Sequence, residues 1–123
     1  MTGPELVDRA ETVAANAYAP YSKYFVGASV LTTDGRVFDG VNVENAAYPL
    51  GVCAEKSAIV SAATAGVRPG EIAAIGITAS PCGGCRQWLH EWRIPLVAFR
   101  RADGTVAEYT ADALLPETWN LPA

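Results

Sequence analysis

The chain has 123 residues, half of them apolar, and a formal net charge of −4 at pH 7. This length and composition predict one domain over residues 1–123, with a core that needs no disulfide bonds. Because no run of about eighteen apolar residues is present and the few Lys and Arg residues form no basic stripe, neither a membrane nor a nucleic-acid partner is expected.

The first half of the chain begins with a helical pattern. Apolar residues recur at steps of three and four over residues 4–17, which predicts an amphipathic helix with Pro4 in its first turn. Strand patterns follow at 26–33 and 36–43, and a tight turn at Asp34-Gly35 separates them. These two strands are predicted to form an antiparallel hairpin.

The second half of the chain alternates helix and strand patterns. A nearly all-apolar run at 72–79 predicts a central strand that is covered on both faces. The other predicted elements are a helix from Cys53 to a cap at Gly66, a short helix at 83–92, strands at 95–100 and 105–110, and a helical turn at 111–116 capped by Thr110. The link between the last two strands is shorter than the dozen or so residues of a parallel crossover, so an antiparallel pair is expected. This order predicts a three-layer α/β domain with a mixed five-stranded sheet.

The three cysteines, Cys53, Cys82 and Cys85, are an odd number. Residues 1–10 place acids among their apolar positions, unlike an export signal, so the sequence predicts a cytoplasmic protein. In that setting the thiols are expected to bind metal or take part in catalysis rather than to form a disulfide framework. One disulfide pair with a spectator thiol is the alternative.

The cysteines lie at the starts of two predicted helices, where the helix dipole and free N–H groups favour the thiolate. Cys82 and Cys85, in a C-x-x-C spacing, can hold one ion from a single turn, and Cys53 can join them if the two helices lie side by side. Three protein ligands leave one open position on a tetrahedral zinc, which is typical of a catalytic site. Glu55 is near enough in sequence to move a proton there.

Other interpretations of these residues remain open. The C-x-x-C spacing also occurs in redox pairs, although such motifs have no use for a third thiol. A structural zinc would need a fourth ligand, and His90 is expected instead to be a surface or helix-packing residue. Glu55 is also compatible with an ordinary acid in a first helical turn. Trp88 and Trp92 are expected to pack in a core or at a subunit interface.

The segments C-A-E at 53–55 and P-C-G-G-C at 81–85 match the signature of zinc-dependent nucleobase deaminases in its three-cysteine variant. Further segments resemble successive landmarks of the cytidine deaminases, in their small homotetrameric form: YAPYSKYFVGA, GVNVENAAY, CAEKSA, PCGGCRQ and LLPETW. They follow one another in the family's order between about residue 18 and residue 119. The predicted antiparallel pair of last strands agrees with the nucleoside-acting branch of these enzymes. The resemblance therefore implies the α/β/α fold of that family.

The resemblance implies that Cys53, Cys82 and Cys85 hold Zn²⁺ and that Glu55 is the proton shuttle. The implied reaction is hydrolytic deamination of cytidine or deoxycytidine to uridine or deoxyuridine, with release of ammonia, in pyrimidine salvage. Zinc lowers the pKa of its bound water from about 15.7 towards neutrality, and Glu55 carries the proton to the pyrimidine N3 and then to the amino group.

The resemblance also implies a set of substrate contacts, namely Tyr24, Asn42, Glu44, Ala54, Tyr48 and Trp119. Asn42 and Glu44 match residues that bind the sugar 3′-hydroxyl, and Tyr24 stands where the family usually has a Phe against the base. Tyr48 and Trp119 correspond to residues that reach the site from neighbouring subunits. A homotetramer is therefore expected to complete each pocket.

Two features depart from the family pattern. Lys56 follows the predicted catalytic Glu, where the family commonly has Arg. Its ammonium can place a positive charge near the thiolates, but it lacks the planar set of N–H donors of a guanidinium. Arg86 is a second candidate for that role. The short link before Pro81 is expected to leave one rim of the pocket more open. A deaminase of a larger cytosine nucleoside, such as blasticidin S, and a non-catalytic zinc-binding domain are the alternative functions.

Overall fold

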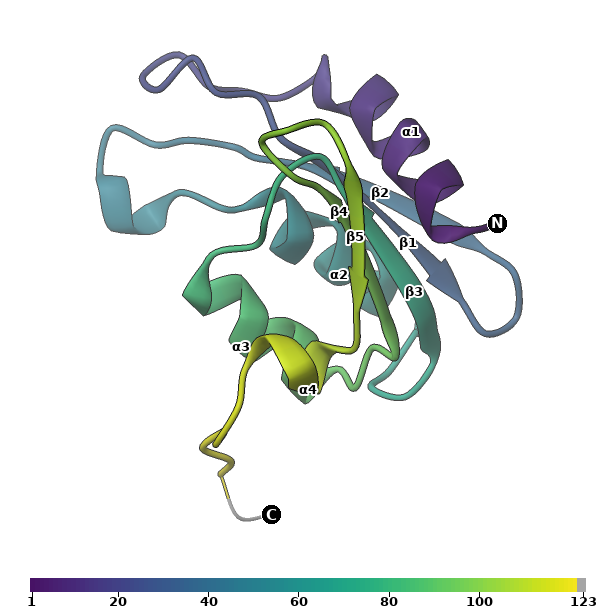
Figure 1. The fold of residues 1–123 in the computed structure, drawn as a ribbon. Coiled ribbons are helices and arrows are strands. Elements are labelled where there is room, and N and C mark those ends of the chain that lie inside the picture. The colour runs from purple at the N-terminus through teal and green to yellow at the C-terminus, as the bar shows by residue number, and fades with distance from the viewer. Residues whose placement is uncertain (122–123) are drawn as a thin grey trace.

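The structure, a computed structural model, describes residues 1–121, so the last two residues of the predicted domain lie outside it. Helices and strands follow one another in the predicted order (Figure 1). They are α1 (Gly3–Ala14), β1 (Gly27–Thr32), β2 (Val37–Val41), the 3₁₀ turn η1 (Tyr48–Leu50), α2 (Ala54–Thr64), β3 (Ile72–Ile77), α3 (Gly83–Glu91), β4 (Leu96–Arg100), β5 (Val106–Tyr109) and α4 (Ala111–Leu114).

The five strands form one mixed sheet in the order β2-β1-β3-β4-β5. Strand β3 lies at its centre, as its apolar run predicts, and it pairs parallel with β4 and antiparallel with β1. The hairpin of β1 and β2 and the antiparallel pair of β4 and β5 are both confirmed. Because β3 and β4 run parallel, their carboxyl ends meet at the same edge of the sheet.

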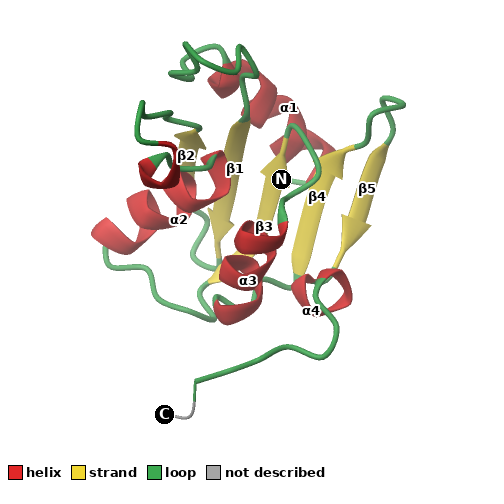
Figure 2. Ribbon diagram, turned by 90° about the vertical axis from the view of Figure 1, so that its left-hand side faces the viewer, coloured by secondary structure: helices red, strands yellow, loops and turns green. Residues whose placement is uncertain are grey.

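The helices form layers on both sides of this sheet. Helix α1 covers one face, and α2, α3 and α4 lie on the other (Figure 2), so the predicted α/β/α fold is confirmed. Figure 1 shows the segment after α4 extending away from the sheet. Among the helices within residues 1–121, none has the length and apolar character that a membrane crossing requires.

Glycines in the strands allow the helices to lie close to the sheet, as Gly76 and Gly40 illustrate. A Cβ atom at Gly76 in β3 would lie 2.4 Å from the backbone carbon of Leu6 in α1. A Cβ atom at Gly40 in β2 would lie 2.2 Å from the backbone nitrogen of Ala58 in α2. Contacts this short do not occur between real atoms, so only glycine permits this packing. Gly40 thereby sets the height of α2 above the sheet.

The first helix differs from its prediction at both ends. It begins one residue early, because Thr2 caps it: the Thr2 hydroxyl accepts from the N–H of Glu5, and the Glu5 carboxylate accepts from the N–H of Thr2. It ends at Ala14 rather than at residue 17. Beyond this point the chain turns towards β2, where the N–H of Tyr18 donates to the carbonyl of Asn42 at 3.0 Å.

Candidate metal centre and substrate pocket

The three cysteines converge at the starts of α2 and α3. Cys53 is the N-cap residue of α2, one position before the helix that was predicted to begin with it, and Cys82 is the N-cap residue of α3. Cys85 lies in the first turn of α3. The three Sγ atoms all lie within 4.8 Å of one another. The predicted approach of Cys53 to the C-x-x-C pair is therefore confirmed.

This donor set fits zinc. Sulfur atoms that each lie about 2.3 Å from one tetrahedral Zn²⁺ are about 3.8 Å from one another. The three Sγ atoms here lie within 4.8 Å of one another, which is compatible with that geometry. Burial raises the pKa of Cys53, and burial and the Glu55 charge raise that of Cys85. Crowded thiols of this kind are stabilised as thiolates by a divalent cation.

Cys82 is the most exposed of the three thiols, and its pKa shifts the other way. Burial alone would raise it, but hydrogen bonds from the backbone N–H groups of Cys85 and Gly84 hold the pKa of Cys82 below its ordinary value. These N–H groups belong to the first turn of α3, where a helix leaves its donors without intrahelical partners. The prediction that a helix start favours the thiolate, and so lowers the pKa of the thiol, therefore holds for Cys82.

Glu55 lies in the first turn of α2 beside the cysteines, and only 4% of its surface is exposed. Burial raises the pKa of its carboxyl, while its backbone N–H, a hydrogen bond with Cys85 and the nearby Lys56 partly offset that shift. A raised pKa makes a carboxyl a better proton acceptor, and a carboxyl that has accepted a proton can return it. The position and environment of Glu55 are therefore those of a general acid and base.

The cysteines and Glu55 open into a pocket of about 530 Å³, a volume within the usual range of small-molecule sites. It lies at the carboxyl ends of the parallel strands β3 and β4, where open α/β sheets commonly bind ligands. Its walls come from five parts of the chain: Ser22, Tyr24 and Val26 before β1, Asn42 and Glu44 after β2, residues 53–55, residues 77–80 with Cys82, and residues 100–102.

Four of the six predicted substrate contacts line this pocket: Tyr24, Asn42, Glu44 and Ala54. The other two, Tyr48 and Trp119, do not line it within the single chain. Their side chains are 77% and 70% exposed. Their proposed place in the pocket of a neighbouring subunit stays a prediction.

Asn42 holds the loop before β1 on two sides. Its Oδ1 atom accepts from the N–H of Val26 at 2.9 Å, and its Nδ2 atom donates to the carbonyl of Tyr24 at 2.8 Å. The sequence did not predict these bonds. They leave the amide one free N–H for a ligand.

Glu44 holds the same loop from the other end. Its Oε1 atom accepts from the N–H groups of Tyr21 at 3.0 Å and Ser22 at 3.1 Å, and its Oε2 atom accepts from the Ser22 hydroxyl. The Ser22 hydroxyl, together with these backbone donors, keeps the pKa of the Glu44 carboxyl below its ordinary value. Both predicted sugar-binding residues therefore also position the loop that carries Tyr24.

The two predicted cationic neighbours of the thiolates have different surroundings. The Lys56 ammonium lies 6.0 Å from the centre of the Trp88 ring, and its charge favours the ionised forms of Cys53 and Glu55. The Arg86 guanidinium instead braces the loop before α3, through bonds to Pro81 O at 2.9 Å, Leu114 O at 3.1 Å and Ser80 Oγ at 3.2 Å. Within residues 1–121, neither side chain forms a hydrogen bond to a cysteine sulfur.

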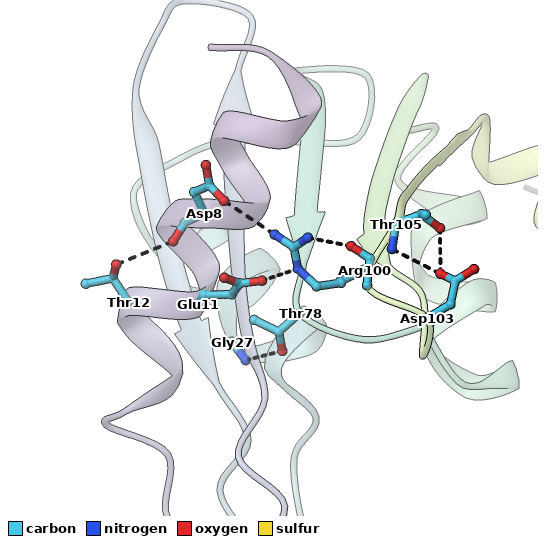
Figure 3. A network of polar contacts seen from close by, with 9 residues as sticks. Asp8, Glu11, Thr12, Gly27, Thr78, Arg100, Asp103 and Thr105 are labelled. Carbon is cyan, nitrogen blue, oxygen red and sulfur yellow. Dashed lines mark hydrogen bonds and ion pairs between the residues drawn. The ribbon is translucent and has the colours of Figure 1, made fainter.

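Residues 100–102, which follow β4 and form one rim of the pocket, were not predicted from the sequence to line it. Figure 3 shows the Arg100 guanidinium between Asp8 and Glu11 of α1. The guanidinium also donates to the carbonyl of Gly104 at 2.8 Å. Arg100 is thus fixed by its partners and anchors this rim to α1. The rule that parallel strands present ligand-binding loops at their carboxyl ends was the available signal for this segment.

A second pocket, of about 500 Å³, lies between α2 and α3 and is lined in part by Trp88 and Trp92. Both tryptophans are half-buried and pack against the main core, as expected. This pocket contains none of the three cysteines, so the chemistry is assigned to the other one.

Residues 3–100 match the family model of the cytidine and deoxycytidylate deaminase zinc-binding region. Together with the fold and the cysteine cluster, this match defines a zinc-binding deaminase domain. The cytidine deaminase of Sporosarcina psychrophila is 37% identical over 121 residues, which cover 91% of this chain and 87% of that protein. The chain belongs to the cytidine deaminase family.

Solved structures agree with this assignment. The crystal structure of cytidine deaminase from Burkholderia pseudomallei is 44% identical with a TM-score of 0.90, and the alignment covers 97% of this chain and all of that one. The structure of cytidine deaminase from Mycobacterium tuberculosis is 33% identical with a TM-score of 0.84, covering 98% of this chain and 99% of that one. The predicted family, fold class and zinc-binding character are confirmed.

Proposed function

We propose that this protein catalyses the zinc-dependent hydrolytic deamination of cytidine and deoxycytidine to uridine and deoxyuridine, with release of ammonia, in pyrimidine salvage. Membership of a family of cytidine deaminases supports this activity. The observation that carries it is the position of the buried Glu55 carboxyl in the same pocket as three cysteines whose Sγ atoms lie within 4.8 Å of one another.

In this proposal Cys53, Cys82 and Cys85 hold Zn²⁺ and leave its fourth position open. Among residues 1–121, no histidine or acidic side chain joins their cluster as a fourth ligand. Zinc, when bound, polarises a water and so supplies a nucleophile at neutral pH. The open position distinguishes this cluster from a closed structural site.

Glu55 carries the protons of the reaction. It takes the proton of the attacking water and gives it to N3 of the pyrimidine while a C–O bond forms at C4. It then moves the second proton to the amino group, the C4–N bond breaks, and ammonia leaves. Since burial raises the pKa of this carboxyl, it can return the protons that it accepts.

The pocket residues orient the nucleoside. Tyr24 stacks on the base. Ala54, at the buried start of α2, contacts the base from the floor of the pocket. The sugar 3′-hydroxyl donates a hydrogen bond to the Glu44 carboxylate and accepts one from the second N–H of the Asn42 amide. These assignments are supported by the shared pocket.

The proposed assembly is a homotetramer in which Tyr48 and Trp119 enter the pockets of neighbouring subunits. Tyr48 and Trp119 are 77% and 70% exposed in the single chain, so both are accessible to a neighbouring subunit, which supports this assembly. The cytoplasmic location stays a prediction from the sequence.

A substrate panel tests the proposed activity. The zinc-loaded protein is incubated with cytidine, deoxycytidine, cytosine, adenosine and blasticidin S, and ammonia release and ultraviolet absorbance are followed. Turnover of cytidine and deoxycytidine is expected. Turnover of blasticidin S alone would replace the proposed substrate, and no turnover by a fully zinc-loaded protein would indicate a non-catalytic zinc domain.

A further inference from the structure

Ser22 lies in the loop between α1 and β1 and links two parts of the substrate pocket. Its hydroxyl donates to Oε2 of Glu44 and accepts from the N–H of Tyr24 at 3.0 Å. All three residues line the same pocket. One hydroxyl therefore joins the carboxylate proposed to bind the sugar to the backbone of the aromatic residue proposed to stack on the base.

The hydrogen bonds of Glu44 leave little freedom for its carboxylate. Two backbone N–H groups, from Tyr21 and Ser22, occupy Oε1, and the Ser22 hydroxyl occupies one side of Oε2. A carboxylate offers about four acceptor positions, so one position remains, on Oε2. Glu44 can thus receive one further donor, and the Ser22 hydroxyl fixes the direction from which that donor comes.

The loop itself needs such support. Lys23, between Ser22 and Tyr24, has a φ of 59°, in the left-handed region that residues other than glycine rarely adopt. A strained residue of this kind persists only where its surroundings hold it. Asn42 holds the loop after Lys23, through Tyr24 and Val26, and the Ser22 hydroxyl holds it at Lys23 through Glu44 and Tyr24.

We infer that Ser22 is a positioning residue that orients Glu44 towards the sugar hydroxyl of the nucleoside, an inference that rests on the proposed deaminase function. Ser22 lines the same pocket as Cys53 and Glu55, but within residues 1–121 its hydroxyl forms hydrogen bonds with Glu44 and the backbone of Tyr24, not with those residues. Its loss should therefore weaken substrate binding equally in the ground state and the transition state. Such a loss raises KM and leaves kcat unchanged.

The test compares Ser22→Ala with the parent enzyme on deoxycytidine and on 2′,3′-dideoxycytidine, which lacks the 3′-hydroxyl. On deoxycytidine, KM should rise about fivefold to tenfold with kcat within a factor of two, as expected when one hydrogen bond to a charged group is weakened and not fully lost. On dideoxycytidine, KM should rise by a smaller factor, because only the lost bond to the Tyr24 backbone affects that substrate. Ser22→Thr, which keeps the hydroxyl, should restore most of the KM for deoxycytidine.

Ser61→Ala, at an exposed position of α2, is the matched control and should change neither constant. An unchanged KM for Ser22→Ala on deoxycytidine, an equal rise on both substrates, or a fall in kcat alone would each overturn the inference. If Ser22→Ala does not fold, the near-isosteric Ser22→Cys, a weaker donor, is measured by the same criteria. An inactive parent enzyme would instead contradict the proposed function.

Discussion

The imidazole Nδ1 of His90, near the end of α3, lies 2.7 Å from the Oδ1 atom of Asp112 in α4. The other ring nitrogen of His90 lies 2.9 Å from Oδ1 of Asn120 in the segment after α4. One histidine thus joins α3, the helix capped by Cys82, to the C-terminal part of the chain. The sequence interpretation of His90 as a helix-packing residue agrees with this contact.

This contact predicts a pH-dependent stability. The hydrogen bond to Asp112 foremost, then that to Asn120, raises the pKa of His90 in the folded protein, with the charges of Asp112 and Glu91 adding to the effect. The stabilisation is fully present below the ordinary histidine pKa of about 6.5 and is lost as pH rises through the raised value. Thermal unfolding of the parent protein and of His90→Gln, measured from pH 5.5 to 8.5, should differ most at the acidic end. A difference that is constant across this range would contradict the prediction.

Glu55→Gln should retain zinc and lose nearly all turnover. The amide keeps the size of the buried side chain but cannot accept and return a proton, and general acid-base catalysis contributes typically about 10²- to 10⁴-fold. Metal content and kcat for cytidine are the measurements, and Glu108→Gln, an exposed acid on β5, is the control. Turnover near the parent rate with full zinc content would remove Glu55 from the mechanism.

Removal of zinc should lower the unfolding temperature. The ligands come from the starts of two different helices, so the metal cross-links α2 and α3. A ligand that binds only the folded state stabilises it by about 2.7 kcal/mol at a free concentration of one hundred times Kd. Differential scanning calorimetry before and after chelation measures the effect. Zn²⁺ should restore it and Mg²⁺ should not, because Mg²⁺ prefers oxygen ligands. Equal stability with and without zinc would exclude the cross-link.

Gly40→Ala should destabilise the protein by about 1–3 kcal/mol, the usual cost of overpacking. The added Cβ atom would lie 2.2 Å from the Ala58 nitrogen and would push α2 away from the sheet. Gly51→Ala is the control, because the nearest atom to its Cβ would be at 3.5 Å, an ordinary contact. Chemical denaturation gives both free energies of unfolding. Equal values for the two variants would show that α2 adjusts without loss.

Trp119→Ala should raise KM for cytidine about threefold to tenfold if the indole stacks in a neighbour's pocket, since such aromatic contacts contribute about 0.5–1.5 kcal/mol. Leu121→Ala, a similarly exposed position in the same segment, should leave KM unchanged. Light scattering checks that both variants keep the oligomeric state of the parent protein. If Trp119→Ala and the parent protein have the same KM, Trp119 does not contribute to substrate binding.

Local patterns were sufficient to predict much of this molecule. The Asp34-Gly35 turn fixes the first hairpin, and the spacing of Cys82 and Cys85 at a helix start indicates a shared ion. Glu55 was predicted to lie beside the cysteines because it follows Cys53 at the start of the same helix, and the structure places it there. Each of these inferences depends on residues that are close together in the chain.

The features that the sequence did not predict depend on distant partners. The end of α1 is set by the pairing of Tyr18 with the chain after β2, and periodicity alone carries no information on that contact. The Ser22 hydroxyl meets Glu44 across 22 positions, and Arg100 meets Glu11 across 89. No local spacing encodes such pairs, so the loop and the rim around the predicted chemistry became visible only in the folded structure.

The hydrogen bonds of Glu44 have a consequence for enzyme engineering. A substitution at position 44, made to accept a modified sugar, would also release the N–H groups of Tyr21 and Ser22 and loosen the loop that carries Tyr24. Residues 78–80 form another wall of the pocket, and variation there leaves those bonds intact. Libraries that seek new nucleoside substrates should therefore vary that wall and keep Glu44.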